Sequence, residues 1–138
     1  MNFTRRAVLV GAAAVPLLRG SHPNTVRLDA ISGPQLPHRL TIPAFPEHPA
    51  AYFELREYRA SDQAGLDRWH RVLMSGEFAH CGIEPLLWQR DRNLHYLFPF
   101  EALAARAESW TLLASHPSWI SLRESVRVSA VTIYRRAS

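Results

Sequence analysis

The segment 52-YFELREYR-59 has the alternating pattern of a β-strand, with the aromatic and branched residues that strands favour. Side chains alternate between the two faces of a strand, so Phe53 and Leu55 share one face. The opposite face carries Tyr52, Glu54, Arg56 and Tyr58. This strand is expected to open the folded domain, which we place at residues 51–138.

The residues that follow predict the order strand, helix, strand, strand, helix, strand. Ser61-Asp62 is a helix N-cap, and Gly82 is expected to stop the first helix. The second helix is predicted between Pro99 and Pro117, with Leu103 on its apolar face. The other predicted elements are strands at 83–90, 93–98 and 126–134, a tight polar turn at 91–93, and one further helical turn at 118–122.

This order is that of an α+β, ferredoxin-like βαββαβ fold, a four-stranded antiparallel sheet with two helices on one face. Two helices cover only one side of such a sheet, and an 88-residue domain buries only about two-thirds of its unfolded surface. The uncovered face carries aromatic side chains, so we expect a homodimer. Two sheets packed face to face would form a dimeric α/β barrel with an internal cavity.

The first 50 residues differ in composition from the rest of the chain. The Arg5-Arg6 pair precedes an apolar run of 12 residues, which is too short to span a membrane, since a spanning helix takes about 20. We therefore predict a twin-arginine signal peptide at residues 1–20 and export to the periplasm. A chance Arg pair on an ordinary signal or a tail is the alternative, and both cleavage near Ala14 and retention as an anchor stay open. Residues 21–50 are rich in Pro and are expected to form a disordered linker outside the fold.

Composition excludes several classes of chemistry. All 16 basic residues are Arg, and without a Lys the chain can neither form a Schiff base nor supply a P-loop lysine. A single Cys excludes an intrachain disulfide framework, and the spacing of the seven His predicts no metal site and no cofactor. Residues 51–138 carry 11 Arg and 10 acidic residues, a net charge of +1, so we expect no nucleic-acid partner.

Four blocks in this order resemble the NIPSNAP family. They are the opening strand 52-YFELREY-58, the strand 83-IEPLLW-88, the block 93-NLHYLFPFEALAAR-106 and the block 115-SHPSW-119. Pro85 and Phe98 depart from the family pattern, and the hairpin turn is short, which puts any function of that loop in doubt. The resemblance implies a ferredoxin-like dimeric α/β barrel. The NIPSNAP family has no settled enzymatic activity, so it implies no named reaction.

Five residues are candidates for ligand binding in the expected cavity: Glu54, Arg56, Tyr58, Trp88 and His95. The first three share one strand face, where a carboxylate, a guanidinium and a phenol could orient a small organic acid or a quinone-like ligand. His95 and Trp88 lie on neighbouring strands of the hairpin, a placement that suits proton transfer. The alternatives are an ion pair of Glu54 with Arg56 at a dimer interface and a Trp88–His95 pair that only packs.

Two functions remain open. The first is a barrel that binds a small organic ligand and transforms it, if at all, without a cofactor. The second is a non-catalytic dimeric protein-interaction module in the periplasm. The first requires a pocket in which the candidate side chains converge, and the second requires an exposed apolar patch.

Overall fold

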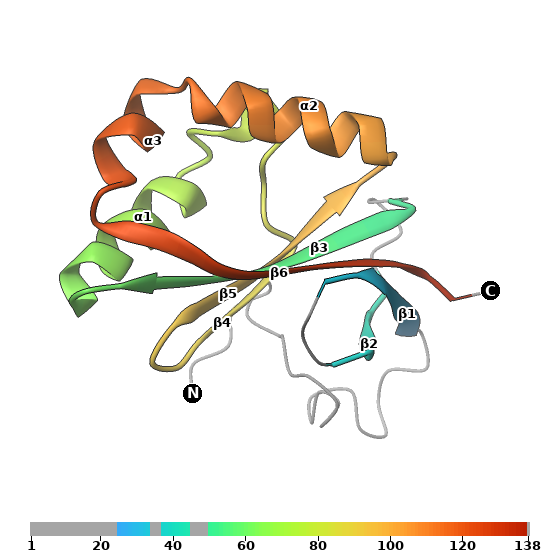
Figure 1. Ribbon diagram of the computed structural model, residues 1–138. Coiled ribbons are helices and arrows are strands. Elements are labelled where there is room, and N and C mark those ends of the chain that lie inside the picture. The colour runs from blue at the N-terminus through green and yellow to red at the C-terminus, as the bar shows by residue number, and fades with distance from the viewer. Residues whose placement is uncertain (1–24, 34–36, 45–49, 138) are drawn as a thin grey trace.

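Six strands form one curled antiparallel sheet in the computed structural model, which describes residues 25–33, 37–44 and 50–137 (Figure 1). Three helices lie on one side of this sheet. The strands follow one another across the sheet in the order β2-β1-β6-β3-β5-β4. The elements are β1 (Thr25–Ser32), β2 (Arg39–Pro43), β3 (Tyr52–Ala60), α1 (Gln63–Met74), a short 3-10 turn η2 (Ala79–Cys81), β4 (Leu87–Arg90), β5 (Leu94–Phe100), α2 (Leu103–Ala114), α3 (Pro117–Leu122) and β6 (Val126–Arg136).

The segment 52–59 forms the central strand, as its pattern predicts. β3 pairs with β5 on one side and with β6 on the other, so its backbone is hydrogen-bonded along both edges. The predicted turn at Asp91 is also present, because the Asp91 side chain accepts a hydrogen bond from the Asn93 N–H at 2.8 Å. Asp62 caps α1 as expected, accepting from the Gly65 N–H at 2.8 Å.

The predicted four-stranded ferredoxin-like sheet with two helices is wrong. The described residues are α+β, but their sheet has six strands and is accompanied by three helices. Both extra strands come from residues 21–50, which the Pro content assigned to a linker. Pro43 is the last residue of β2, so here a proline ends a strand rather than excluding one. Within β1 and β2 the buried side chains are Leu28, Leu40 and Ile42.

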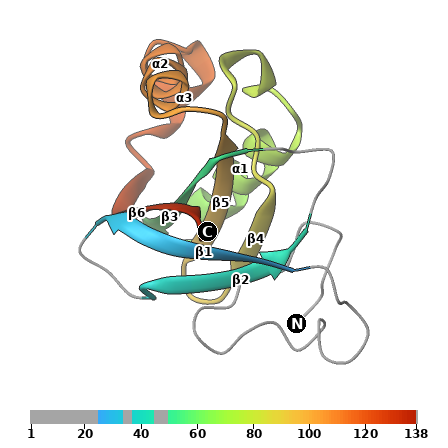
Figure 2. The same cartoon turned by 90° about the vertical axis from the view of Figure 1, so that its right-hand side faces the viewer.

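The β1–β2 hairpin covers part of the sheet face that lies away from the helices. Figure 2 shows both strands beneath the rest of the sheet, with the helices on the other side. Leu28 and Leu40 pack there in one core with Phe53, Leu97 and Tyr134. The hairpin therefore supplies the cover for which a second subunit was expected, and the predicted dimeric barrel loses its physical basis.

The other core lies between the sheet and the helices. It includes Trp69 of α1, Phe78, Tyr96 of β5 and Leu113 of α2, all buried. The first helix is shorter than predicted, ending at Met74, and Gly82 instead ends η2 with a φ of 83°. Glycine suits this left-handed backbone position.

The apolar face predicted for the second helix is also wrong in phase. α2 buries Ser109 and Leu113, whereas the side chain of Leu103 is exposed. The cause is polar: Arg106 and Trp110 of this helix reach a carboxylate in the sheet, and that contact fixes the rotation of the helix.

The sequence predicted a signal peptide and no membrane-spanning helix. The predicted signal peptide at residues 1–20 lies outside the described residues. Among the described residues, no helix is long and apolar enough to span a membrane.

Replacing Leu28 by Ala tests whether the N-terminal hairpin belongs to the core. Leu28 is 0% exposed, so the variant should lose about 2–5 kcal/mol of unfolding free energy through lost burial and the cavity left behind. Urea denaturation measures the loss. Ile31→Ala, on the same strand at 41% exposure, is the control and should change stability by less than about 0.5 kcal/mol. Equal, small losses for both variants would mean that β1 is not part of the core.

Candidate functional site

Two polar clusters flank the central strand β3, one on each face of the sheet. The Glu54 cluster, under α2, consists of Glu54, Arg56, Arg106 and Trp110. The Glu57 cluster, on the face away from the helices, consists of Glu57, Arg59, His95 and Ser129. They differ in burial and in access to ligands, so each is described in turn.

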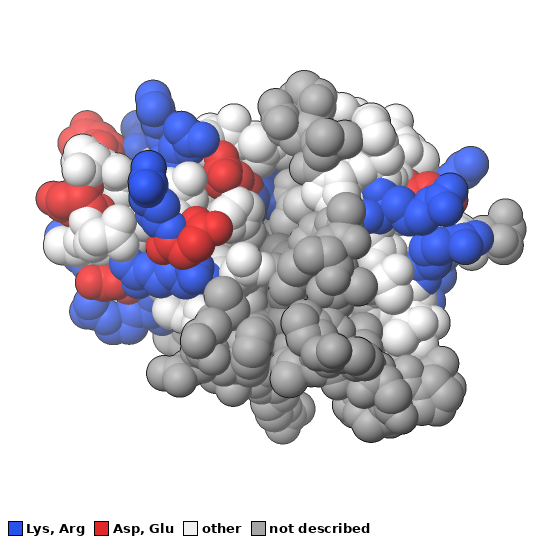
Figure 3. Space-filling view, turned by 90° about the horizontal axis from the view of Figure 1, so that it is seen from below, with Lys and Arg blue, Asp and Glu red and all other residues white. Residues whose placement is uncertain are grey.

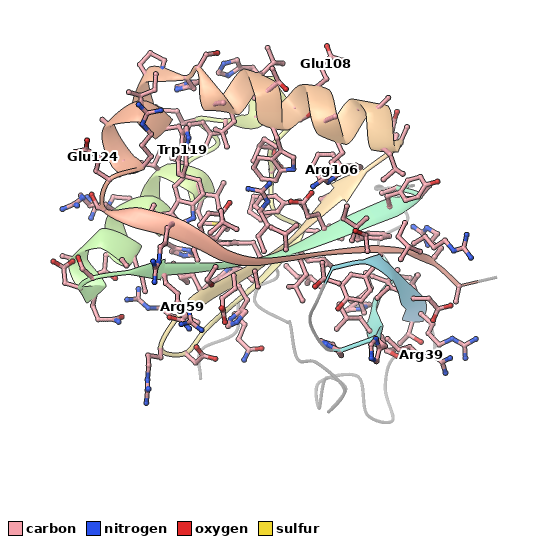
Figure 4. All side chains as sticks on the ribbon, viewed as in Figure 1. Arg39, Arg59, Arg106, Glu108, Trp119 and Glu124 are labelled. Carbon is pink, nitrogen blue, oxygen red and sulfur yellow. The ribbon has the colours of Figure 1, made fainter. Side chains whose placement is uncertain are left out.

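The carboxylate of Glu54 is fully buried, and it is held by three donors. The Nε groups of Arg56 and Arg106 each bond one of its two oxygens, and the Trp110 indole donates to Oε1 at 2.9 Å. Figure 4 shows Arg106 reaching from α2 toward the sheet. The Arg56 guanidinium also lies 3.5 Å from the centre of the Trp110 ring, which adds a cation–π contact. A buried charge is tolerated only when it is paired in this way.

Three of the predicted ligand-binding residues therefore lie under the helices. Glu54 and Arg56 form the expected ion pair, but it connects the sheet to α2. Tyr58 lies in the core on the same side, 4.9 Å from the Trp69 ring, and burial raises the pKa of its phenol to about 12. Fully packed side chains of this kind hold the fold together and offer little to a ligand.

Trp88 and His95, predicted to act together, lie on opposite faces of the sheet. Trp88 is opposite Tyr96 in the β4–β5 register, whereas His95 is opposite Gln89. The Trp88 ring instead packs 4.4 Å from His70, whose Nδ1 is 2.8 Å from the Tyr96 hydroxyl. Burial lowers the pKa of His70. Of the five predicted residues, only His95 reaches the face that the helices leave free.

On that face, three side chains converge on the carboxylate of Glu57. His95 Nε2 lies 3.0 Å from Oε2, Ser129 donates to Oε1 at 2.5 Å, and the Arg59 Nε lies 3.3 Å from Oε1. Burial raises the pKa of Glu57, but the bonds from Ser129 and His95 and the nearby Arg59 outweigh it, so the net shift is downward. The carboxylate is therefore ionised at neutral pH.

A β-bulge brings Ser129 into this cluster. In the β3–β6 register Glu57 is opposite Ala130 while Tyr58 is opposite Val128, which leaves Ser129 as an extra residue. Because of this insertion, Ser129 and Ala130 both line the same hollow, which strict alternation along a strand would prevent. Bulges often redirect side chains in this way next to functional sites.

The Glu57 cluster lines a hollow of about 250 Å³. Its other lining residues are Leu55, Ala130 and Thr132. The hollow thus combines a charged and hydrogen-bonding wall with the apolar side chains of Leu55 and Ala130. The described part of the chain has no group of three or more His, Cys, Asp or Glu side chains placed to hold a metal ion. Burial raises the pKa of the Cys81 thiol, which makes it a poor nucleophile.

Sequence reasoning missed three of the four members of the cluster. Glu57 and Arg59 lie on the strand face shared by Phe53 and Leu55, which was expected to be apolar and helix-covered. Their alternation was a usable signal, because an acid and a base two residues apart on one face indicate a polar stretch. Ser129 gave no signal, since a bulge cannot be located from alternation alone.

Replacing Glu54 by Gln tests the structural role of the cluster under α2. The change leaves two partly buried guanidinium groups without their counter-charge, so the unfolding free energy should fall by about 3–5 kcal/mol. Glu108→Gln is the control, since Glu108 is exposed on the outer side of α2 (Figure 4) and should change stability by less than about 0.5 kcal/mol. Urea denaturation at pH 7 compares the two, and a Glu54→Gln variant as stable as the control would contradict the role.

Two comparisons with known proteins, by family model and by curated sequence, found no match. The function of the Glu57 cluster is therefore inferred from its own chemistry.

Proposed function

We propose that this protein binds a small organic acid in the hollow at the Glu57 cluster. The observation that carries the proposal is the convergence of a guanidinium, an imidazole and a hydroxyl on one carboxylate, beside a hollow on the face that no helix covers. The sequence predicted a small organic acid or a quinone-like ligand on the strand face of Glu54, Arg56 and Tyr58. The proposal moves the site to the other face of β3.

Arg59 is the residue that would bind the acid. Its Nε faces Glu57, and the hydrogen bond and ion pair of Arg59 within the described residues use this Nε and neither of the two terminal Nη groups. The side chain is 51% exposed, so a ligand can reach it. A guanidinium binds a carboxylate through two parallel hydrogen bonds, and Glu57 holds this one in place before the ligand arrives.

The rest of the hollow would hold the body of the ligand. Leu55 and Ala130 offer apolar surface, while Ser129 and His95 provide polar groups at the edge. A volume of about 250 Å³ is below the range of about 300–1,000 Å³ typical of ligand pockets, so the ligand is small. The proposal concerns binding and assigns no reaction.

The alternative, a protein-interaction module, lacks a single apolar patch among the described residues. The exposed large apolar side chains of the described residues are Ile31 on β1, Leu103 and Leu112 on α2, and Ile120 on α3. Nine residues apart, Leu103 and Leu112 point to opposite sides of the helix, because each residue turns the helix by about 100°. Ile31 lies on β1, on the other side of the sheet from the helices. Scattered residues of this kind are common on monomeric proteins.

Binding of benzoate, with benzamide as an uncharged analogue, tests the proposal. Isothermal titration calorimetry on the full chain should detect benzoate but not benzamide, since only benzoate pairs with Arg59. Arg59→Gln should weaken benzoate binding about tenfold or more, the usual effect of losing hydrogen bonds to a charged group. Arg39→Gln is the matched control, because the Arg39 Nε lies 3.3 Å from Asp29 in a similar ion pair far from the hollow (Figure 4). Equal binding of both compounds, or by both variants, would contradict the proposal.

We also propose that the chain is exported in the folded state through its Arg5-Arg6 pair. The support is the order of charged and apolar residues in the leader. In a bacterial host, Arg5→Lys with Arg6→Lys should retain the protein in the cytoplasm, as should a host without the twin-arginine translocase. Arg39→Lys controls for loss of Arg elsewhere. Undiminished export of the double variant would reject this route.

Membership of the NIPSNAP family stays a prediction from the four sequence blocks.

A further inference from the structure

A second and larger hollow, of about 550 Å³, lies at one end of the sheet. Four arginines line it, each from a different part of the fold: Arg59 from β3, Arg92 from the β4–β5 turn, Arg123 from the end of α3 and Arg127 from β6. We call this the arginine pocket. Viewed from below, basic side chains lie at both ends of the molecule with acidic side chains among them (Figure 3), and the pocket lies at the end near α1 and α3.

The arginines in this pocket are only partly neutralised by acidic side chains of the described residues. Glu124 is the one acidic residue in the lining, which leaves four positive charges against one negative charge, a net charge of +3. Within the described residues, Arg59 is the one lining arginine that forms an ion pair, and its partner is Glu57. Arg92, Arg123 and Arg127 are exposed, and no acidic side chain of the described residues forms an ion pair with them.

Two of these arginines face each other directly. The β3–β6 register places Arg59 opposite Arg127, next to the Ala60–Val126 pair at the end of the two strands. Side chains at such positions have Cβ atoms about 4.5–5.5 Å apart, and like charges there destabilise a sheet. A polyanion between the two guanidinium groups would offset this repulsion, because both groups could then bind the same ligand.

We infer that the arginine pocket binds a small anion with two or more oxyanion groups, of the pyrophosphate or tricarboxylate class. Four arginines stand against two carboxylates, Glu124 in the lining and Glu57 paired with Arg59, so an anion with at least two charges would balance the excess, and the guanidinium groups can bind several of its oxygens at once. The volume falls within the range of about 300–1,000 Å³ of small-molecule pockets. Ser61, Asn93 and Ser125 add neutral hydrogen-bonding groups to the lining. This inference goes beyond the proposed function, with which it shares only Arg59.

Arg127→Gln tests the inference in two ways. Without ligand, the variant should melt about 1–5 °C above the parent protein, because the cross-strand repulsion is gone. With pyrophosphate, the parent protein should gain melting temperature and the variant should bind about tenfold or more weakly by calorimetry. Sodium chloride at the same ionic strength separates specific binding from general screening. Citrate in place of pyrophosphate shows whether phosphate or carboxylate groups are preferred.

Arg135→Gln is the matched control, since Arg135 is exposed on the same strand but lies opposite Tyr52 of β3 and Asp29 of β1. It should leave pyrophosphate binding unchanged, and it should not raise the melting temperature, because it removes no pair of like charges. Arg127 does not line the smaller hollow, so Arg127→Gln should also leave benzoate binding unchanged, and the two proposals can fail separately. The inference is overturned if neither anion raises the melting temperature more than sodium chloride does, or if Arg127→Gln and Arg135→Gln bind pyrophosphate equally well.

Discussion

The packing of the β1–β2 hairpin against the sheet is the contact on which the rest of the structure depends. Leu28 and Leu40 remove Phe53 and Tyr134 from water on a face that the helices cannot reach. Hydrogen bonds fix the hairpin in place, with the Tyr134 hydroxyl donating to Pro37 O at 2.6 Å and the Ala137 N–H donating to Arg27 O at 2.8 Å. Among the described residues the cover extends over only part of the face, and the Glu57 cluster lies in the part that these strands do not cover.

The other face is organised by a charge. Glu54 attracts Arg56 along its own strand and Arg106 from α2, so the helix is bound to the sheet by polar contacts as well as by Leu113. Such a cluster costs desolvation energy that well-packed apolar side chains would avoid. In return it fixes which side of α2 faces inward, a choice that the weakly amphipathic sequence of this helix leaves open.

The central part of the fold could be predicted from sequence because its signals are local. The alternation of 52–59, the cap at Asp62 and the turn at Asp91 all depend on residues close to one another in the chain, and all three are observed. The N-terminal hairpin could not be predicted in the same way. Its proline content resembles that of a linker, and its stability comes from contacts with Phe53 and Tyr134, which lie far along the chain.

The candidate site was harder to predict for a related reason. Alternation correctly grouped Glu54, Arg56 and Tyr58 on one face, but it could not tell which face the helices would cover. That choice follows from where the connections cross the sheet, which is a property of the whole fold. His95 was identified, whereas its partner Glu57 was missed because it shares a face with Phe53 and Leu55.

Arg59 lines both hollows, and this shared position links the two proposed sites thermodynamically. An anion that holds the Arg59 guanidinium in one hollow makes it less available to a ligand in the other hollow, so each ligand would weaken the binding of the other. Such antagonism is reciprocal, since each ligand must weaken the other by the same factor at equilibrium. Through one side chain, the occupancy of one hollow would thereby change the affinity of the other, with no movement of the sheet.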